Sequence, residues 1–152
     1  MVAVAGSDNG SFGEPSNWFV TFHERSERQW VNRFCPGKFK HVGAFGYVAE
    51  ARVWVFVDFL TARLMVRVAS DRSADILIAE ETAGGTVVKM PEIDKESKKY
   101  RLKPGLWCVP ATAHLLGLGG SALLPDQLFR QCMANGGQMV TQNNELVQKA
   151  EN

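Results

Sequence analysis

The sequence lacks the features that mark exported, membrane-spanning and nucleic-acid-binding proteins. Its apolar runs are all shorter than the roughly 18 residues that a membrane-spanning helix needs. The first six residues carry neither the positive region nor the long apolar stretch of a signal peptide. The formal net charge of +1 is too small to draw the chain to nucleic acid or to a membrane surface. We therefore predict no signal peptide, no membrane partner and no nucleic-acid partner.

Cysteine is scarce, and its placement excludes two further classes of protein. The chain has three cysteines, Cys35, Cys108 and Cys132, with no Cys-x-x-Cys pair. An odd number at wide spacing argues against a disulfide framework and against a zinc site, so we expect a reducing compartment and no metal or cofactor. Cys35 and Cys132 lie beside Phe34 and Met133, and we interpret both as packed free thiols.

The length of 152 residues, with 45% hydrophobic and 22% charged residues, is typical of one globular domain. Residues 1–17 are rich in glycine, serine and asparagine and are predicted to form a flexible leader. Residues 138–152 have few apolar side chains and are predicted to form a polar tail. Residues 18–137 remain as the single domain.

Runs of strand-forming and helix-forming residues predict an α+β domain. The strands are expected at residues 18–22, 41–48, 52–58, 63–68 and 86–88. Short links between three of them favour an antiparallel meander. Helices are expected at 74–82, at 127–134 and after a capping box formed by Ser26 and Gln29. The fold predicted is a small antiparallel sheet with a cysteine-bearing helix packed against it.

That helix begins at Cys108 and is the most informative stretch of the chain. Pro110 suits the first turn, and Gly117 can adopt the left-handed conformation that ends a helix. A thiol at a helix N-terminus faces free backbone N–H groups and the positive end of the helix dipole, which stabilise a thiolate. Two interpretations stay open: Cys108 is a nucleophile, or it is a small buried residue that opens a core helix.

A nucleophilic cysteine needs a base and a group that orients the base. His41 begins one predicted strand and Asp58 ends the next, so an antiparallel hairpin makes them neighbours. His114 lies six residues after Cys108, on a different face of the helix, and His23 has no recognisable partner. Cys108, His41 and Asp58 are therefore the predicted catalytic triad.

The order of these motifs resembles the NlpC-like papain-fold cysteine hydrolases in their circularly permuted form, and most of all small phage- and prophage-encoded members. The matching segments are residues 39–45, 54–58, 108–109, 115–117 and 125–129, within a stretch from about 18 to 137. Two departures from the family pattern are Phe59, where a proline often follows the acidic residue, and Pro110, where the helix often carries an acidic side chain. Neither departure removes a triad member.

The resemblance implies a permuted papain-like fold and a hydrolase that cleaves an amide or ester bond in peptidoglycan stem peptides. It also implies synthesis in a bacterial cytoplasm. Trp107 and Trp54 are predicted pocket residues, although Trp107 can equally serve to anchor its helix in the core. The backbone N–H of Cys108 is the expected oxyanion donor.

A second interpretation belongs to a different class of protein. The chain is then a structural or assembly component of a phage particle that keeps the papain-like fold as a scaffold, which fold alone does not exclude. Its termini would bind other virion proteins, with Met139, Val140, Leu146 and Val147 as the anchors.

Overall fold

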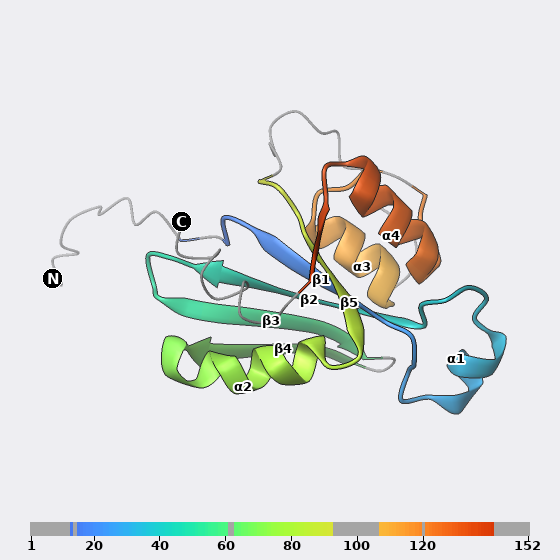
Figure 1. Ribbon diagram of the computed structural model, residues 1–152, viewed down its shortest axis with the longest axis horizontal. Coiled ribbons are helices and arrows are strands. Elements are labelled where there is room, and N and C mark those ends of the chain that lie inside the picture. The colour runs from blue at the N-terminus through green and yellow to red at the C-terminus, as the bar shows by residue number, and fades with distance from the viewer. Residues whose placement is uncertain (1–12, 14, 61–62, 93–106, 120, 142–152) are drawn as a thin grey trace, which may run out of the picture.

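The computed structural model describes residues 13, 15–60, 63–92, 107–119 and 121–141. These form an α+β fold built on a six-stranded antiparallel sheet (Figure 1). The strands are β1 (Trp18–His23), β2 (His41–Val48), β3 (Val53–Leu60), β4 (Arg63–Ser70), β5 (Gly85–Lys89) and β6 (Gln138–Val140). The helices are α1 (Gln29–Phe34), α2 (Asp71–Thr82), α3 (Cys108–Leu115) and α4 (Pro125–Ala134). The predicted α+β class, with an antiparallel sheet and a helix that starts at Cys108, is confirmed.

The strands lie in the order β4-β3-β2-β1-β5-β6. Strands β2, β3 and β4 form the predicted meander, since each pairs antiparallel with the next. Strand β1 lies between β2 and β5, and this places His23 beside His41. Residues 138–140, which the sequence assigns to the tail, pair with β5 as strand β6, so the sheet extends past the expected boundary at residue 137.

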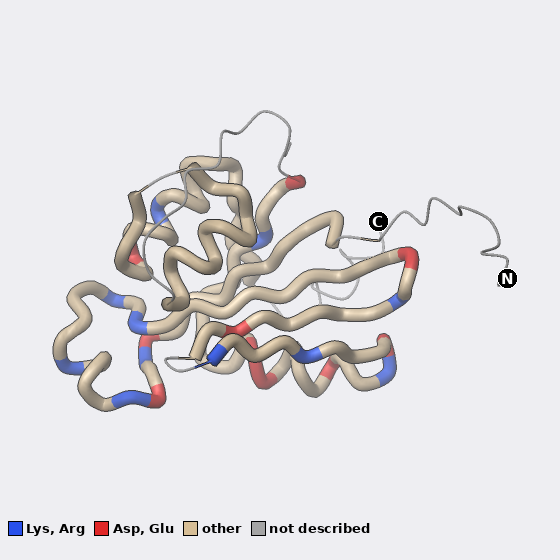
Figure 2. Tube along the Cα trace, turned by 180° about the vertical axis from the view of Figure 1, so that it is seen from behind, with Lys and Arg blue, Asp and Glu red and all other residues tan. Residues whose placement is uncertain are grey.

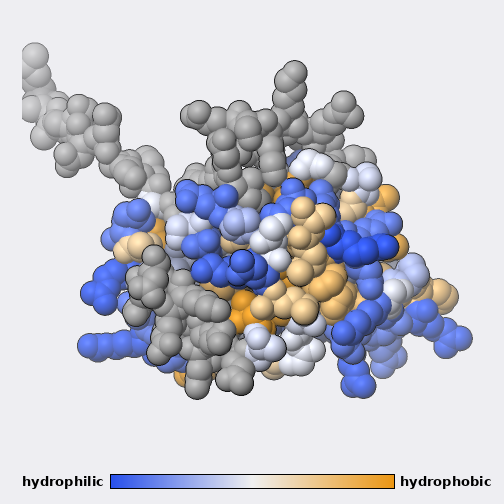
Figure 3. Space-filling model, turned by 45° about the horizontal axis from the view of Figure 1, so that its top comes forward, coloured by the Kyte–Doolittle hydropathy of each residue, from blue (hydrophilic) through white to orange (hydrophobic). Residues whose placement is uncertain are grey.

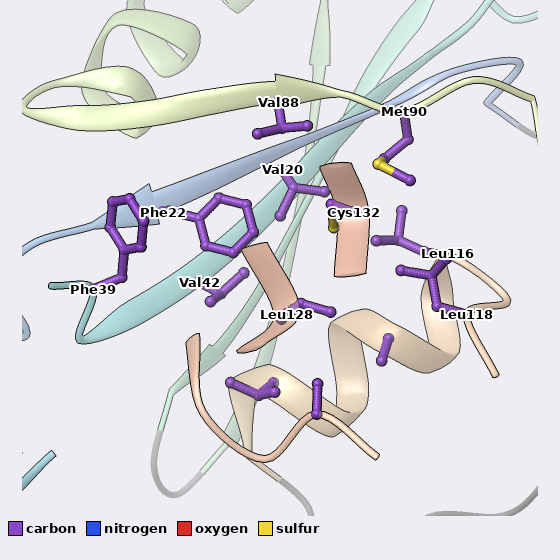
Figure 4. Packing of buried hydrophobic residues seen from close by; sticks show 13 residues of the cluster. Val20, Phe22, Phe39, Val42, Val88, Met90, Leu116, Leu118, Leu128 and Cys132 are labelled. Atoms are coloured by element: carbon purple, nitrogen blue, oxygen red, sulfur yellow. The ribbon is translucent and has the colours of Figure 1, made fainter. Parts of the chain in front are cut away.

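Helices cover both faces of the sheet. Figure 1 shows α3 and α4 together on one side of the sheet and α2 on the other. Under α3 and α4, the core residues come from β1, β2, β5 and both helices (Figure 4): Val20, Phe22, Phe39, Val42, Val88, Met90, Val109, Ala113, Leu116, Leu118, Ala122, Leu128 and Cys132. Seen from this side, the surface mixes apolar patches with charged side chains (Figure 3).

The core beneath α2 is mainly aromatic. Its members are Phe19, Phe45, Tyr47, Trp54, Phe56, Ala69, Ala74, Ile78 and Val87. Because side chains alternate along a strand, the residues of β2 that face α2 are His41, Gly43, Phe45 and Tyr47. The face under α2 is therefore aromatic at one end of β2 and polar at the other.

The segments that flank the domain differ in part from expectation. Ser26 does not cap α1, which begins at Gln29; instead the Asn32 amide closes the turn, bonding the backbone N–H of Ser26 at 2.7 Å and its carbonyl at 2.8 Å. Pro15, at the end of the predicted leader, lies against Gly46 of β2. Residues 1–12 and 14 of the leader, and residues 142–152 of the tail with Leu146 and Val147, lie outside the described residues.

Candidate active site

Cys108 is the first residue of α3, with Trp107 as its N-cap. Pro110 fits the first turn, where no backbone N–H is needed, and is buried there. Gly117 has a φ of 62° and ends the helix, with the N–H of Leu118 donating to the carbonyl of Ala113 at 2.9 Å. The Cys108 side chain is half-buried, so its sulfur lies in the first turn without being sealed in the core.

His41 and Asp58 lie together where β2 begins and β3 ends. In the register of the two strands Asp58 pairs with Gly43, so it shares a face with His41 two residues earlier. His41 Nε2 and Asp58 Oδ1 are 2.8 Å apart, and both side chains keep a small contact with solvent. A carboxylate on one ring nitrogen fixes the orientation of an imidazole and leaves the other nitrogen free to act.

The other partner of His41 is Cys108. Burial by itself lowers the pKa of His41, but side-chain hydrogen bonds to Asp58 and to Cys108, and then the charges of both groups, raise that pKa to about 10. Because Nε2 is engaged by Asp58, Nδ1 is the nitrogen that remains for the thiol. The structure thus brings Cys108, His41 and Asp58 together from three separate elements. A protonated imidazole beside a sulfur is the arrangement that maintains a thiolate.

No partner was predicted for His23, yet in the structure it stacks on His41. The two ring centroids are 6.0 Å apart, with an angle of 24° between the planes. Burial, followed by the positive charge of His41, lowers the pKa of His23. His23 and His41 therefore lie stacked at the adjoining ends of β1 and β2. The position of His23 beside His41 follows from the strand order, because β1 ends at His23 next to the start of β2.

Glu81 of α2 is a second residue that sequence patterns did not single out. Burial, followed by the charge of Asp58, raises the pKa of Glu81, whereas Arg67 and His41 act in the opposite direction. Arg67 Nη2 donates to Glu81 Oε2 at 3.1 Å. The polar end of the α2 face therefore contains two carboxylates and the imidazole.

Backbone contacts hold the start of β2 in place. The Asp126 carboxylate, in the first turn of α4, accepts the N–H groups of Lys38 and Phe39, both at 3.0 Å. The N–H of Lys40 donates to the carbonyl of His23 at 2.7 Å. These bonds connect α4 and β1 to the residues just before His41, so the imidazole sits on a restrained strand end rather than on a loop.

The two tryptophans predicted for the pocket lie in different surroundings. Trp54 is 3% exposed and packs with Phe19, Phe45 and Tyr47 in the aromatic core. Trp107 is 41% exposed, and its indole N–H donates to the carbonyl of Leu123 at 3.2 Å, linking α3 to the segment before α4. Trp107 therefore lies next to Cys108, whereas Trp54 contributes to the core.

The other two cysteines differ from Cys108 in their surroundings. Burial raises the pKa of the Cys132 thiol to about 12, and that side chain is sealed within the core. Burial also raises the pKa of Cys35, although this thiol is only half-buried. Cys132 is therefore a packed thiol, as predicted, whereas Cys35 is only partly covered, beside the exposed Phe34. His114 lies in the last turn of α3, as its spacing from Cys108 implies.

A pocket of about 430 Å³ opens on the Asp58 side of His41. Its described lining includes His23, His41, Asp58, Glu81 and three arginines, Arg25, Arg28 and Arg63, but not Cys108. Figure 2 shows several positive residues along the loops around α1, at the same end of the sheet. The pocket therefore contacts the imidazole and the Asp58 carboxylate but is not lined by the thiol.

Chemically, the arrangement provides a nucleophile, a base and a group that orients the base. Within residues 15–60, 63–92 and the two described C-terminal segments, no three histidine, cysteine, aspartate or glutamate side chains are arranged to hold a metal ion. Among the helices of these segments, none is long and apolar enough to cross a bilayer.

Comparisons with known proteins give no relative to set beside this geometry. No protein-family model matches the chain, and neither a curated protein nor a solved structure matches it.

Proposed function

We propose that the protein is a thiol hydrolase that cleaves an amide or ester bond through Cys108, His41 and Asp58. One observation carries the proposal: His41 bonds Asp58 at 2.8 Å, and Cys108 at the start of α3 is the other side chain that acts on the same imidazole. The resemblance of the sequence to circularly permuted NlpC-like papain-fold cysteine hydrolases supports the same chemistry. On that resemblance we assign the papain-like permuted fold, and peptidoglycan stem peptides as the substrate.

The mechanism follows from the positions of the three side chains. The proton of the Cys108 thiol passes to His41, and the thiolate attacks the substrate carbonyl carbon to form a tetrahedral intermediate. His41 then donates that proton to the leaving amine or alcohol, the C–N or C–O bond breaks, and an acyl-enzyme remains. A water molecule, deprotonated by His41, attacks the acyl carbon and releases the carboxylic acid and the thiol. Asp58 holds the imidazole and stabilises its protonated form.

The experiment has two parts, so that chemistry and substrate are tested separately. An activated ester should leave an acyl adduct on Cys108, detectable by mass spectrometry, and His41→Ala should abolish it. Absence of the adduct in the wild-type protein contradicts the hydrolase. Purified peptidoglycan should gain free amino groups on incubation, in wild type and in Cys35→Ala but not in Cys108→Ala. A protein that forms the adduct yet releases no amino groups contradicts the peptidoglycan assignment alone.

A second candidate is an assembly component of a phage particle, and one surface feature favours it. Strand β4 lies at the edge of the described sheet, and Leu64, Val66 and Val68, on its face away from α2, are 54%, 54% and 63% exposed. Apolar side chains on an edge strand are typical of contact surfaces. Under this alternative Val66→Lys abolishes incorporation into particles while Cys108→Ala leaves it intact. The reverse result favours the enzyme.

A further inference from the structure

The buried face of α2 changes character along its length. Ala74, Ile78 and Glu81 follow the three- and four-residue spacing of one helical face, and all three are buried. The first two pack on the aromatic core, whereas the third carries a carboxylate and is 9% exposed. A carboxylate at a core position costs free energy unless its surroundings are built to receive it.

The sheet leaves room for this carboxylate at Gly43. A Cβ on Gly43 would collide with Oε1 of Glu81, so a side chain of any size at this position displaces the carboxylate. Gly43 is also the residue that pairs with Asp58 across β2 and β3. Because Gly43 has no side chain, the Glu81 carboxylate can lie directly over the pair of strands that carries His41 and Asp58.

Arg67 holds the other side of the Glu81 carboxylate. Its Nη2 donates to Glu81 at 3.1 Å, its Nη1 lies 3.5 Å from Glu80, and its guanidinium stacks 5.7 Å from the centre of the Phe56 ring. Arg67 of β4 therefore packs on the Phe56 ring of the aromatic core and forms a salt bridge with Glu81. The charged groups that act on Glu81 are Asp58, Arg67, His41 and Glu80.

We propose that Glu81 is a positioning residue for the triad, a second carboxylate that acts with Asp58 to keep His41 protonated beside Cys108. Its carboxylate lines the same pocket as Asp58 and His41, and Arg67 together with the space at Gly43 prevents it from turning away. The inference rests on the proposed function, because a protonated His41 has a purpose only if Cys108 is a nucleophile.

The test follows the titration of His41 by NMR of its ring protons, with His114 as the internal reference. Glu81→Gln keeps the shape of the side chain and removes its charge. We expect the midpoint of His41 to fall by roughly one pH unit, the lower end of what a nearby charge does to an ionisable group. Glu80→Gln is the matched control, since it removes the same charge from the neighbouring residue that also contacts Arg67.

Gly43→Ala supplies a second variant that leaves Glu81 itself unchanged. The added methyl group displaces the carboxylate, so the His41 midpoint should fall in the same direction. Equal midpoints in wild type, Glu81→Gln and Gly43→Ala overturn the inference, as does a shift in Glu80→Gln as large as that in Glu81→Gln. If Cys108 forms the acyl adduct while these midpoints stay equal, the hydrolase stands and the role of Glu81 falls. If no adduct forms, the proposed function fails whatever the midpoints.

Discussion

The face of the sheet beneath α2 has an aromatic half and a polar half, built on the same strands and the same helix. In the aromatic half Phe45 stacks 5.2 Å from Phe19 and packs 6.0 Å from Trp54. In the polar half, two and four residues earlier on β2, Gly43 and His41 occupy the equivalent positions. The backbone pairing is regular throughout, so only the side chains distinguish a core from a candidate site.

The two halves contribute differently to the free energy of folding. The aromatic half removes apolar surface from water, and this stabilises the fold. The polar half contains His41, Asp58 and Glu81, whose side chains are partly removed from water. The cost of desolvation therefore offsets much of the attraction between the imidazole and the carboxylates. Stability should therefore depend on the first half and reactivity on the second.

Phe45→Ala should break the aromatic half and have the largest effect on stability. Truncating a fully buried phenylalanine costs about 3–5 kcal/mol, because it removes buried surface and leaves a cavity. Chemical denaturation measures the loss. Phe34→Ala is the control, since that side chain is 72% exposed and its removal should cost less than about 0.5 kcal/mol. Equal costs for the two variants would show that the aromatic half does not carry the fold.

Raising the pH should reduce the contribution of the polar half to the free energy of unfolding. The folded pKa of His41 lies above its ordinary value of 6.5, at about 10, so its contribution to stability is complete below pH 6.5 and is lost as the pH rises through 10. We expect a loss on the order of 2 kcal/mol, reduced by contact with solvent. Unfolding measured from pH 6.5 to 10 should show this slope in wild type and not in His41→Ala. The same slope in both proteins would mean that another group is responsible.

Trp107→Phe should have the smallest effect and separates the two roles predicted for Trp107. If Trp107 anchors α3, loss of its hydrogen bond to the Leu123 carbonyl costs about 1 kcal/mol and the rate of Cys108 alkylation stays within about twofold. Thermal unfolding and alkylation rates measure the two quantities. An unchanged stability with a large change in alkylation would assign Trp107 to the pocket instead.

Local signals predicted much of this fold. Alternation and aromatic content gave β2 its bounds of His41–Val48, and the start of α3 at Cys108 with its end before Gly117 followed from Pro110 and that glycine. The closeness of His41 and Asp58 followed from hairpin geometry alone. Features that depend on neighbours in sequence, or on adjacent strands, can be inferred without tertiary structure.

The remaining features depend on contacts between distant segments. Strand β1 lies between β2 and β5, and no local pattern specifies that order, so the stacking of His23 on His41 was not predictable. Glu81 follows Glu80 and looks like one more exposed helix residue until Gly43 and Arg67 are placed beside it. Trp54 was predicted for the pocket, but its side chain packs into the aromatic core.

The central claim is that Cys108 is the nucleophile of the proposed hydrolase, and residue-by-residue alkylation at pH 6 tests it most directly. A thiol of ordinary acidity is only about 0.3% ionised at that pH, and alkylation requires the thiolate. We expect Cys108, at the N-terminus of α3, to react with iodoacetamide roughly 100-fold faster than Cys35, the other half-buried thiol. In His41→Ala the two rates should become similar. Slow, equal labelling of Cys35 and Cys108 in the folded wild-type protein would contradict the account.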